Sequence, residues 1–146
     1  MVLTGTGALD GVKRRVLIVD DNPQVRQELR TLLPLAGDIE IVGEAADGRE
    51  AIRLVEALQP EVVLMDLEMP VLDGYEATRQ IKASSPSCRV VALTVHGYEA
   101  ARQKAMQAGV DLFLVKGTAV ESLIQAVSAR PSDPKGCGQT TPAGNP

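Results

Sequence analysis

The sequence predicts an α/β fold: a doubly wound, five-stranded parallel sheet built from five consecutive strand–helix units, written (βα)5. Three observations support this prediction. Short runs rich in valine, isoleucine and leucine recur along the chain, stretches with helical spacing of apolar residues separate them, and capping or breaking residues stand at the boundaries. Strands that alternate with helices pair in parallel through right-handed crossovers, so we expect helices on both faces of the sheet.

The predicted strands are short apolar runs. The second run, IEIVGEA, alternates apolar and polar residues, which indicates a more exposed edge strand. The third run, VVLMD, is apolar throughout until its final aspartate, which is typical of a strand buried on both faces. In chain order the five predicted strands lie at 16–20, 39–45, 62–66, 90–94 and 112–115.

The first two predicted helices follow clear start signals. Asn22 and Pro23 form a cap followed by a first-turn proline, and Asp47 opens the second helix, which Pro60 closes. Both helices then show one apolar face. The apolar positions are Val25, Leu29, Leu32 and Leu33 in the first helix and Ile52, Val55 and Leu58 in the second.

The last three helices are predicted from their boundaries. Asp73 and Gly74 lead into the third, near 75–83, and Gly109 ends the fourth, near 98–108, as a C-terminal cap. Thr118 and Glu121 have the spacing of a capping box at the start of the fifth, which we expect to end before Pro131.

The composition restricts the classes of function. Of the 146 residues 45% are hydrophobic but only 2% aromatic, so the core must be aliphatic and no aromatic platform exists for stacking bases. The net charge is −4 and no basic stripe follows the chain, so we expect no direct nucleic-acid binding by this chain. Cys88 and Cys137 lie far apart without a C-x-x-C motif, which predicts unpaired thiols rather than a zinc site or a disulfide framework.

We expect a single domain over 13–130. Residues 1–12 are rich in glycine and threonine and are expected to be flexible, and 131–146 read as a disordered tail or the start of a linker. The N-terminus has no apolar core of a signal peptide, and no run approaches the ~18 apolar residues of a membrane span. These features favour a cytoplasmic location without membrane contact.

Chemically distinctive residues stand where the predicted strands end. The carboxyl ends of parallel strands meet at one edge of a doubly wound sheet, where such folds bind ligands. Three carboxylates, a hydroxyl and an ammonium group are therefore expected to converge there. They belong to Asp20, Asp21, Asp66, Thr94 and Lys116.

Electrostatics suggest what this cluster binds. Two carboxylates ~4 Å apart repel by about 4 kcal/mol at an effective dielectric constant near 20, so three of them need a cation or protonation. Oxygen ligands suit Mg²⁺, which commonly shares its site with phosphate. Asp20 and Asp21 are placed to hold the metal, while Asp66 can bind metal with one oxygen and attack phosphorus with the other, with no base required. Lys116 can pair with Asp66 and then, with Thr94, contact the transferred group.

Four segments, in this order, resemble the receiver domain of bacterial two-component response regulators, over about residues 13–130. They are VLIVDDN, VVLMDLEMPVLDG, VVALTVH and LFLVKG. Together they form a specific signature, although each alone is weak. The resemblance implies a CheY-like, flavodoxin-like fold, and the style of LTVH and VKG is similar to the NarL/FixJ-type subfamily, whose outputs are helix-turn-helix domains.

The resemblance also implies roles for the residues. Asp66 would be the phosphoacceptor, and Asp20 and Asp21 would bind Mg²⁺ together with Asp66 and the backbone carbonyl of Glu68. Thr94, Lys116 and Phe113 would form the signalling set, with Thr94 and Phe113 as switch residues.

The implied reaction takes a phosphoryl group from a histidine kinase or a phosphotransfer protein onto the domain itself and later hydrolyses it, so the domain is not an enzyme on an external substrate. A changed surface of the fourth helix, fifth strand and fifth helix would then signal to an effector or output domain, or form a phosphorylation-dependent homodimer.

The sequence departs from the commonest receiver pattern in three places. Gly117 follows the lysine where many receivers have a cis proline, so we expect a trans bond and a glycine-dependent turn. Phe113 has no hydroxyl and can only fill or leave an apolar hole. Glu68 and His96 flank the site at positions that tune phosphoryl lifetime in this family.

Three alternatives remain open. A haloacid-dehalogenase-type phosphatase uses similar groups but needs its D-x-D on the first strand, and here the order is reversed. A receiver-like interaction module not regulated by phosphorylation would be expected to lack one of the acidic groups or Lys116. Within the receiver class, the chain could act alone or be the receiver half of a DNA-binding transcription regulator whose output domain is not written here.

Overall fold

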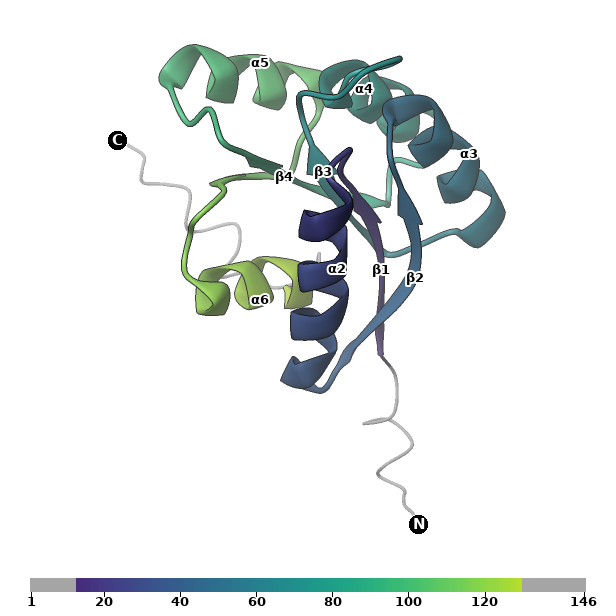
Figure 1. Ribbon diagram of the computed structural model, residues 1–146. Coiled ribbons are helices and arrows are strands. Elements are labelled where there is room, and N and C mark those ends of the chain that lie inside the picture. The colour runs from purple at the N-terminus through teal and green to yellow at the C-terminus, as the bar shows by residue number, and fades with distance from the viewer. Residues whose placement is uncertain (1–12, 130–146) are drawn as a thin grey trace.

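The computed structural model describes residues 13–129, and the expectations for 1–12, for Cys137 and for 131–146 concern parts of the chain outside the described residues. All five strands form one parallel sheet in the order β2-β1-β3-β4-β5 (Figure 1). The predicted (βα)5 fold and the edge position of the second strand are confirmed. The elements are β1 (Arg14–Val19), α2 (Pro23–Leu32), the 3-10 helix η1 (Leu33–Ala36), β2 (Ile39–Ala45), α3 (Gly48–Leu58), β3 (Val62–Asp66), α4 (Gly74–Ser84), β4 (Arg89–Thr94), α5 (Glu99–Ala108), β5 (Leu112–Val115) and α6 (Val120–Ser128).

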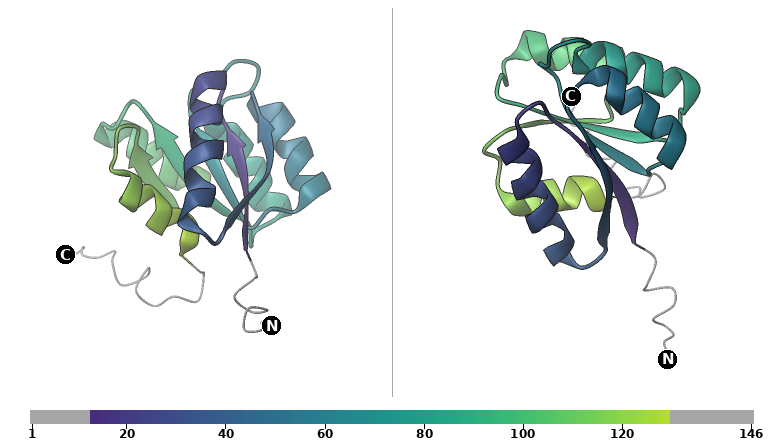
Figure 2. Two further views of the ribbon diagram at one scale, coloured as in Figure 1. Left: turned by 60° about the horizontal axis from the view of Figure 1, so that its bottom comes forward. Right: turned by 45° about the vertical axis from the view of Figure 1, so that its right-hand side comes forward.

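The helices cover the sheet in two layers (Figures 1 and 2). Helices α2 and α6 pack on one face through a cluster that includes Leu29 and Leu123, and α3, α4 and α5 pack on the other through Val55, Ile81 and Ala105. Successive side chains of a strand point to opposite faces, so each central strand contributes residues to both clusters. This explains why the central runs are apolar at every position.

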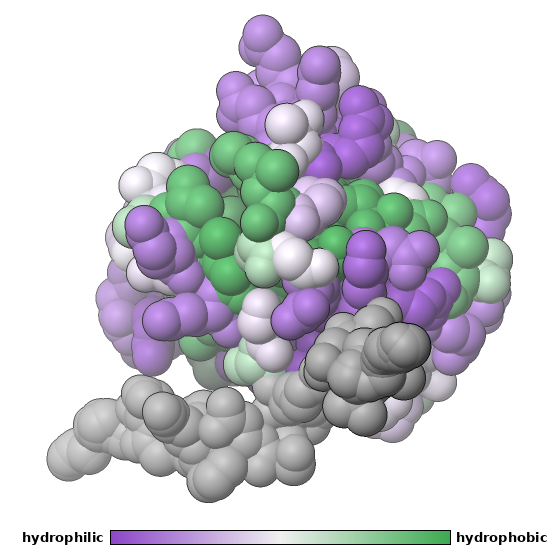
Figure 3. Space-filling model, turned by 90° about the horizontal axis from the view of Figure 1, so that it is seen from below, coloured by the Kyte–Doolittle hydropathy of each residue, from purple (hydrophilic) through white to green (hydrophobic). Residues whose placement is uncertain are grey.

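The surface is mixed rather than uniformly polar. The side seen from below carries groups of hydrophobic residues that hydrophilic ones interrupt (Figure 3). Among the described residues, Leu32, Leu35 and Val120 of α2, η1 and α6 remain exposed. No helix in the described part is both long enough and apolar enough to cross a bilayer.

Three predicted helix starts are confirmed in detail. Asn22, Asp47 and Asp73 each accept a hydrogen bond from a backbone N–H of the first helical turn, at the starts of α2, α3 and α4. These contacts satisfy amides that have no partner within the helix. At the end of α5, Gly109 has φ 108° and caps the helix as predicted.

Two local predictions were wrong. Helix α6 starts after Ala119 without a side-chain cap, so Thr118 lies one residue before the cap position. Its hydroxyl donates instead to the carbonyl of Val115, 2.5 Å away, in a local turn. The capping box with Glu121 therefore does not form.

The first helix was also predicted too long. Helix α2 ends at Leu32, and Pro34 starts the 3-10 turn of η1. Leu33 is fully buried, whereas Leu32 is 40% exposed and does not join the core.

Candidate functional site

The five groups predicted at the strand ends lie together at the carboxyl edge of the sheet. Asp66 is the last residue of β3 and Thr94 the last of β4, while Asp20 directly follows β1 and Lys116 directly follows β5. Strand order explains the placement, because β1, β3 and β4 are neighbours in the sheet and β5 pairs with β4. We call these residues, with Asp21, the rim cluster.

The three aspartates form one acidic group. Asp20, Asp21 and Asp66 each offer a carboxylate oxygen, and these oxygens all lie within 4.8 Å of one another. Asp20 and Asp66 are only 2% and 5% exposed, while Asp21 is exposed to solvent. The cluster therefore combines two buried acids with one that is open to solvent.

Lys116 partly compensates this negative charge: it pairs with Asp66 as predicted, and more closely with Asp20. Its Nζ lies 2.8 Å from Oδ2 of Asp20 and 3.7 Å from Oδ1 of Asp66. The other carboxylate oxygen of Asp20 accepts the backbone N–H of Asn22 at 2.9 Å. Asp20 is thus the main partner of the ammonium group, which leaves Asp66 the less compensated acid.

The environment of Asp66 raises its pKa to about 7. Burial is the largest cause, because it disfavours the charged carboxylate, and the negative charge of Asp20 adds to it. Lys116 and the backbone N–H of Glu68 oppose the rise. Burial lowers the pKa of the Lys116 ammonium, but its hydrogen bond to Asp20 and the nearby carboxylates outweigh this effect, and the net pKa is raised.

The donor set fits a hard divalent cation. Three carboxylates face one ammonium group within the rim cluster, and burial together with the charge of Asp20 raises the pKa of Asp66. Oxygen-only ligands with one side open to solvent suit Mg²⁺, which keeps several waters when bound.

Thr94 and Phe113 lie on the β4–β5 side of the site. Thr94 is 1% exposed, and its hydroxyl oxygen accepts the backbone N–H of His96 at 3.1 Å. Phe113 is partly buried and packs against the core cluster shared with α3, α4 and α5. The ring thus combines apolar contacts with the core and partial exposure to solvent.

Glu68 and His96, which the sequence predicted to flank the site, contact each other, and the sequence did not predict this contact. Nδ1 of His96 lies 2.5 Å from Oε1 of Glu68, with both side chains close to half exposed. The backbone N–H of Glu68 points toward Oδ1 of Asp66 at 3.4 Å. The contact joins the loop after β3 to the loop after β4 at the entrance of the site, and no spacing pattern could have predicted it.

The loop after β3 has an unusual backbone. Val71 adopts φ 71°, and the N–H of Leu72 donates to the carbonyl of Pro70 at 2.7 Å, which closes a tight γ-turn. The carbonyl of Leu72 accepts the N–H of Gly48, the first residue of α3, at 2.9 Å. A side chain at Gly48 would place its Cβ 2.4 Å from that carbonyl oxygen, so only glycine fits.

The turn after Lys116 agrees with the sequence prediction. Gly117 has φ 96°, which favours glycine, and no peptide bond within residues 13–129 is cis.

Comparisons with known proteins agree with this geometry. A family model described as the response regulator receiver domain matches residues 16–128. The response regulator protein VraR of Staphylococcus aureus is 42% identical over 113 residues, which cover 77% of this chain and 54% of that protein. The chain thus spans about half the length of the curated relatives it matches.

Solved structures show the same likeness. The signal receiver domain of the response regulator NarL from Mycobacterium tuberculosis has a TM-score of 0.76 and 34% identity, over 80% of this chain and 94% of that one. A CheX–CheY complex with BeF3 and Mg from Borrelia burgdorferi gives a TM-score of 0.75 and 27% identity, over 82% and 90%. From its fold, its rim cluster and these matches, the chain belongs to the response regulator receiver domain family and is of the CheY-like, NarL/FixJ type.

Proposed function

We propose that Asp66 is the phosphoacceptor and that Asp20, Asp21, Asp66 and the backbone carbonyl of Glu68 bind Mg²⁺. The observation that carries this proposal is the rim cluster itself: three carboxylates within 4.8 Å, two of them buried, beside a single ammonium group. Such an arrangement costs stability when empty, which is expected of a site kept for cation binding and chemistry rather than for folding.

The transfer step follows from the positions of these groups. A carboxylate oxygen of Asp66 forms a bond to phosphorus while the bond from phosphorus to the donor nitrogen, or to the oxygen of a small acyl phosphate, breaks and leaves its electrons with the donor. Bound Mg²⁺ would offset the charge of the phosphoryl oxygens. Lys116 can then turn from the carboxylates toward those oxygens.

The same groups explain how the modification is sensed. Thr94 is buried at the end of β4 and can donate its hydroxyl to the phosphoryl group once that group is present. Two charge-assisted hydrogen bonds, from Thr94 and Lys116, supply roughly 3–6 kcal/mol. Converting a 1:99 equilibrium to 99:1 needs ~5.5 kcal/mol, so the contacts are of the size needed to shift Thr94 and turn Phe113 inward. The remodelled face is that of α5, β5 and α6.

The partners follow from the family. We propose a histidine kinase or phosphotransfer protein as the donor, in the cytoplasm, and an effector or output domain as the receiver of the signal. Because VraR is nearly twice as long as the matched region, and one structural neighbour is described as a DNA-binding response regulator of the LuxR family, the receiver half of a transcription regulator is the favoured context. The domain modifies only itself, and phosphorylation could promote a homodimer.

The proposal is tested by incubating the chain with Mg²⁺ and a small acyl phosphate and measuring intact mass. Wild type should gain one phosphoryl group, Asp66→Asn none, and Asp73→Asn, which alters an acid of the same loop, should behave as wild type. Unchanged labelling of Asp66→Asn would contradict the site assignment. A wild-type chain that takes no label in the presence of Mg²⁺ would favour the alternative of an interaction module not regulated by phosphorylation.

A further inference from the structure

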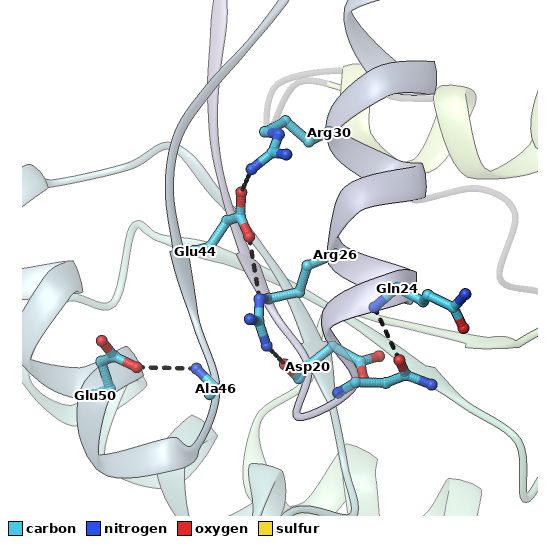
Figure 4. Close-up of polar contacts among 8 residues, drawn as sticks. Asp20, Gln24, Arg26, Arg30, Glu44, Ala46 and Glu50 are labelled. Atoms are coloured by element: carbon cyan, nitrogen blue, oxygen red, sulfur yellow. Dashed lines mark hydrogen bonds and ion pairs between the residues drawn. The ribbon is translucent and has the colours of Figure 1, made fainter.

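Strand β2 supplies no group of the rim cluster, yet its Glu44 is linked to the acidic pair through Arg26 of α2. Nη1 of Arg26 donates to the main-chain carbonyl of Asp20 at 2.7 Å, and its Nε donates to Oε1 of Glu44 at 3.0 Å (Figure 4). Arg30, further along α2, contacts the other carboxylate oxygen of Glu44. Arg26 therefore bridges the edge strand and the residue that begins the acidic pair.

The carbonyl that Arg26 holds determines where the second aspartate lies. The Asp20 carbonyl and the N–H of Asp21 belong to one planar peptide unit, so fixing the oxygen fixes the orientation of the whole plane. The other polar groups of Asp20 are held as well: its N–H donates to the Ala45 carbonyl at 3.0 Å, and its carboxylate is bound by Asn22 and Lys116. The Arg26 contact completes this set.

Helix stability does not account for Arg26. It lies near the N-terminus of α2, where the helix dipole disfavours a positive charge, and the first turn contains no acidic residue to balance it. Its side chain is only 20% exposed, and Glu44 is 24% exposed, so the pair is partly withdrawn from solvent. Glu44 supplies the compensation and fixes the direction of the guanidinium group. A residue that breaks a local rule in this way is expected to serve a site.

We propose that Arg26 is a positioning residue for the cation site. Oriented by Glu44, it fixes the peptide plane between Asp20 and Asp21 and thereby holds the acidic pair in the arrangement that binds a divalent cation. The inference rests on the proposed function of the rim cluster, which it deepens by giving α2 and β2 a role in metal affinity.

The sign of one substitution separates this role from a general effect of charge. Removing a positive charge near an anionic site strengthens cation binding if the charge acts only through space. Removing a contact that orients ligands weakens binding, typically by about 10–100-fold for partners that hold metal ligands. Arg26→Met should therefore weaken Mg²⁺ binding by about 10-fold, against the electrostatic expectation.

Arg30→Met is the matched control. It removes the same charge from the same helix together with a contact to Glu44, on the other carboxylate oxygen, but within the described residues only Arg26 donates to the Asp20 carbonyl. Arg26→Lys is the second variant, because it keeps the charge and loses the planar fork that reaches both partners. It should weaken binding by at least about 3-fold, whereas an effect of charge alone predicts no change.

Mg²⁺ titrations of the unphosphorylated chain, followed by the amide NMR shifts of Asp21 and Glu68, provide the measurement, with thermal unfolding in EDTA as the check on folding. Weaker binding in Arg26→Met, with binding in Arg30→Met unchanged or tighter, supports the inference. Equal or tighter binding in Arg26→Met, or equal weakening in Arg30→Met, overturns it. If Arg26→Met does not fold, Arg26→Lys decides by the same criterion.

The titration of the wild-type chain keeps the two proposals distinguishable. If wild type binds Mg²⁺ and Asp20→Asn abolishes the shifts, the cation site stands and the arginine variants test positioning alone. If wild type shows no Mg²⁺-dependent shifts, the proposed cation site is wrong and the role of Arg26 falls with it.

Discussion

The two sides of the sheet, divided at β3, are built differently. On the β1–β2 side, α2 and α3 start with side-chain caps, and the outer strand β2 buries Ile39 and Ala45. On the β4–β5 side, α5 and α6 have no side-chain cap, and the outer strand β5 has no buried residue, whereas the inner strands β1 and β4 are both well buried.

Helix α5 shows the contrast most clearly. Its only buried residues are Ala101, Ala105 and Ala108, so it contributes little apolar area to the core. The acidic pair follows β1 and lies on the β1–β2 side, which we call the firm side. Thr94, Phe113 and Lys116 belong to β4, to β5 and to the residue after β5, on the β4–β5 side, which we call the loose side. We infer that the acidic pair of the cation site is held in a fixed position, whereas the sensing groups lie where the structure can change conformation.

The largest effect on stability is expected on the firm side. Leu33→Ala leaves a cavity under η1 at a fully buried position and should lower the free energy of unfolding by about 2–5 kcal/mol. Phe113→Leu on β5 replaces a partly buried ring with another apolar side chain and should cost less than about 1.5 kcal/mol. Urea unfolding of both variants measures the difference, and equal losses would contradict the contrast between the two sides.

The largest effect on chemistry is expected on the loose side. Lys116→Met removes the ammonium group that faces the carboxylates and should slow phosphorylation by acyl phosphate by about 100-fold, comparable to losing an oxyanion donor. Lys104→Met is the control, since that ammonium group lies 4.2 Å from the ring centre of Tyr75 and contacts no acid of the cluster in the described structure. A rate for Lys116→Met within a few-fold of wild type would remove Lys116 from the mechanism.

Ionisation of Asp66 should make the metal-free fold less stable as pH rises. Its pKa of about 7 lies above the ordinary value of 3.8, so between these values the folded state binds more protons than the unfolded state. The stabilisation is complete below about pH 4 and is lost as pH rises through 7. With allowance for solvent screening the loss is on the order of 1–2 kcal/mol.

Urea unfolding in EDTA at a series of pH values tests this expectation. Asp66→Asn cannot ionise at this position, so the difference in stability between wild type and variant should change in favour of the variant as pH rises. A difference that is constant from pH 5 to pH 8 would refute the assignment of the titration to Asp66.

The smallest effects concern helix caps and should be of opposite sign on the two sides. Asp47→Ala removes the cap of α3 and should cost about 1 kcal/mol. Tyr98→Ser introduces a capping hydroxyl at the start of α5, where none is present, and should stabilise the domain by up to about 1 kcal/mol. Hydrogen exchange of the α5 amides should slow in Tyr98→Ser, and unchanged exchange would show that α5 is not limited by its missing cap.

Features with local causes could be predicted from the sequence. The strands, the caps at Asn22, Asp47 and Asp73, and the convergence of the rim cluster follow from patterns within a few residues and from the rule that parallel strands end at one edge. Thr118 shows the limit even of local rules, since the sequence does not say that α6 starts one residue later, after Ala119.

Features that join distant segments could not be predicted. Lys116 lies 0.9 Å closer to Asp20 than to Asp66 (2.8 against 3.7 Å), a difference that no sequence pattern encodes. The contacts of Arg26 with Glu44 and of His96 with Glu68 join different elements at no fixed spacing. Residue types and strand ends sufficed to predict that these groups meet, whereas the order of partners within the site required the structure.

Because Gly48 packs against the carbonyl of Leu72, the residue allowed at the start of α3 depends on the conformation of the loop after β3. Every alternative residue at position 48 would push a carbon atom against the Leu72 carbonyl, at the base of the turn in which Val71 is already held in an unfavourable conformation. The segment next to Asp66 therefore cannot be transplanted or redesigned by itself. A chimera that exchanged only residues 67–73 would have to carry the start of α3 with it to keep the surroundings of Asp66 intact.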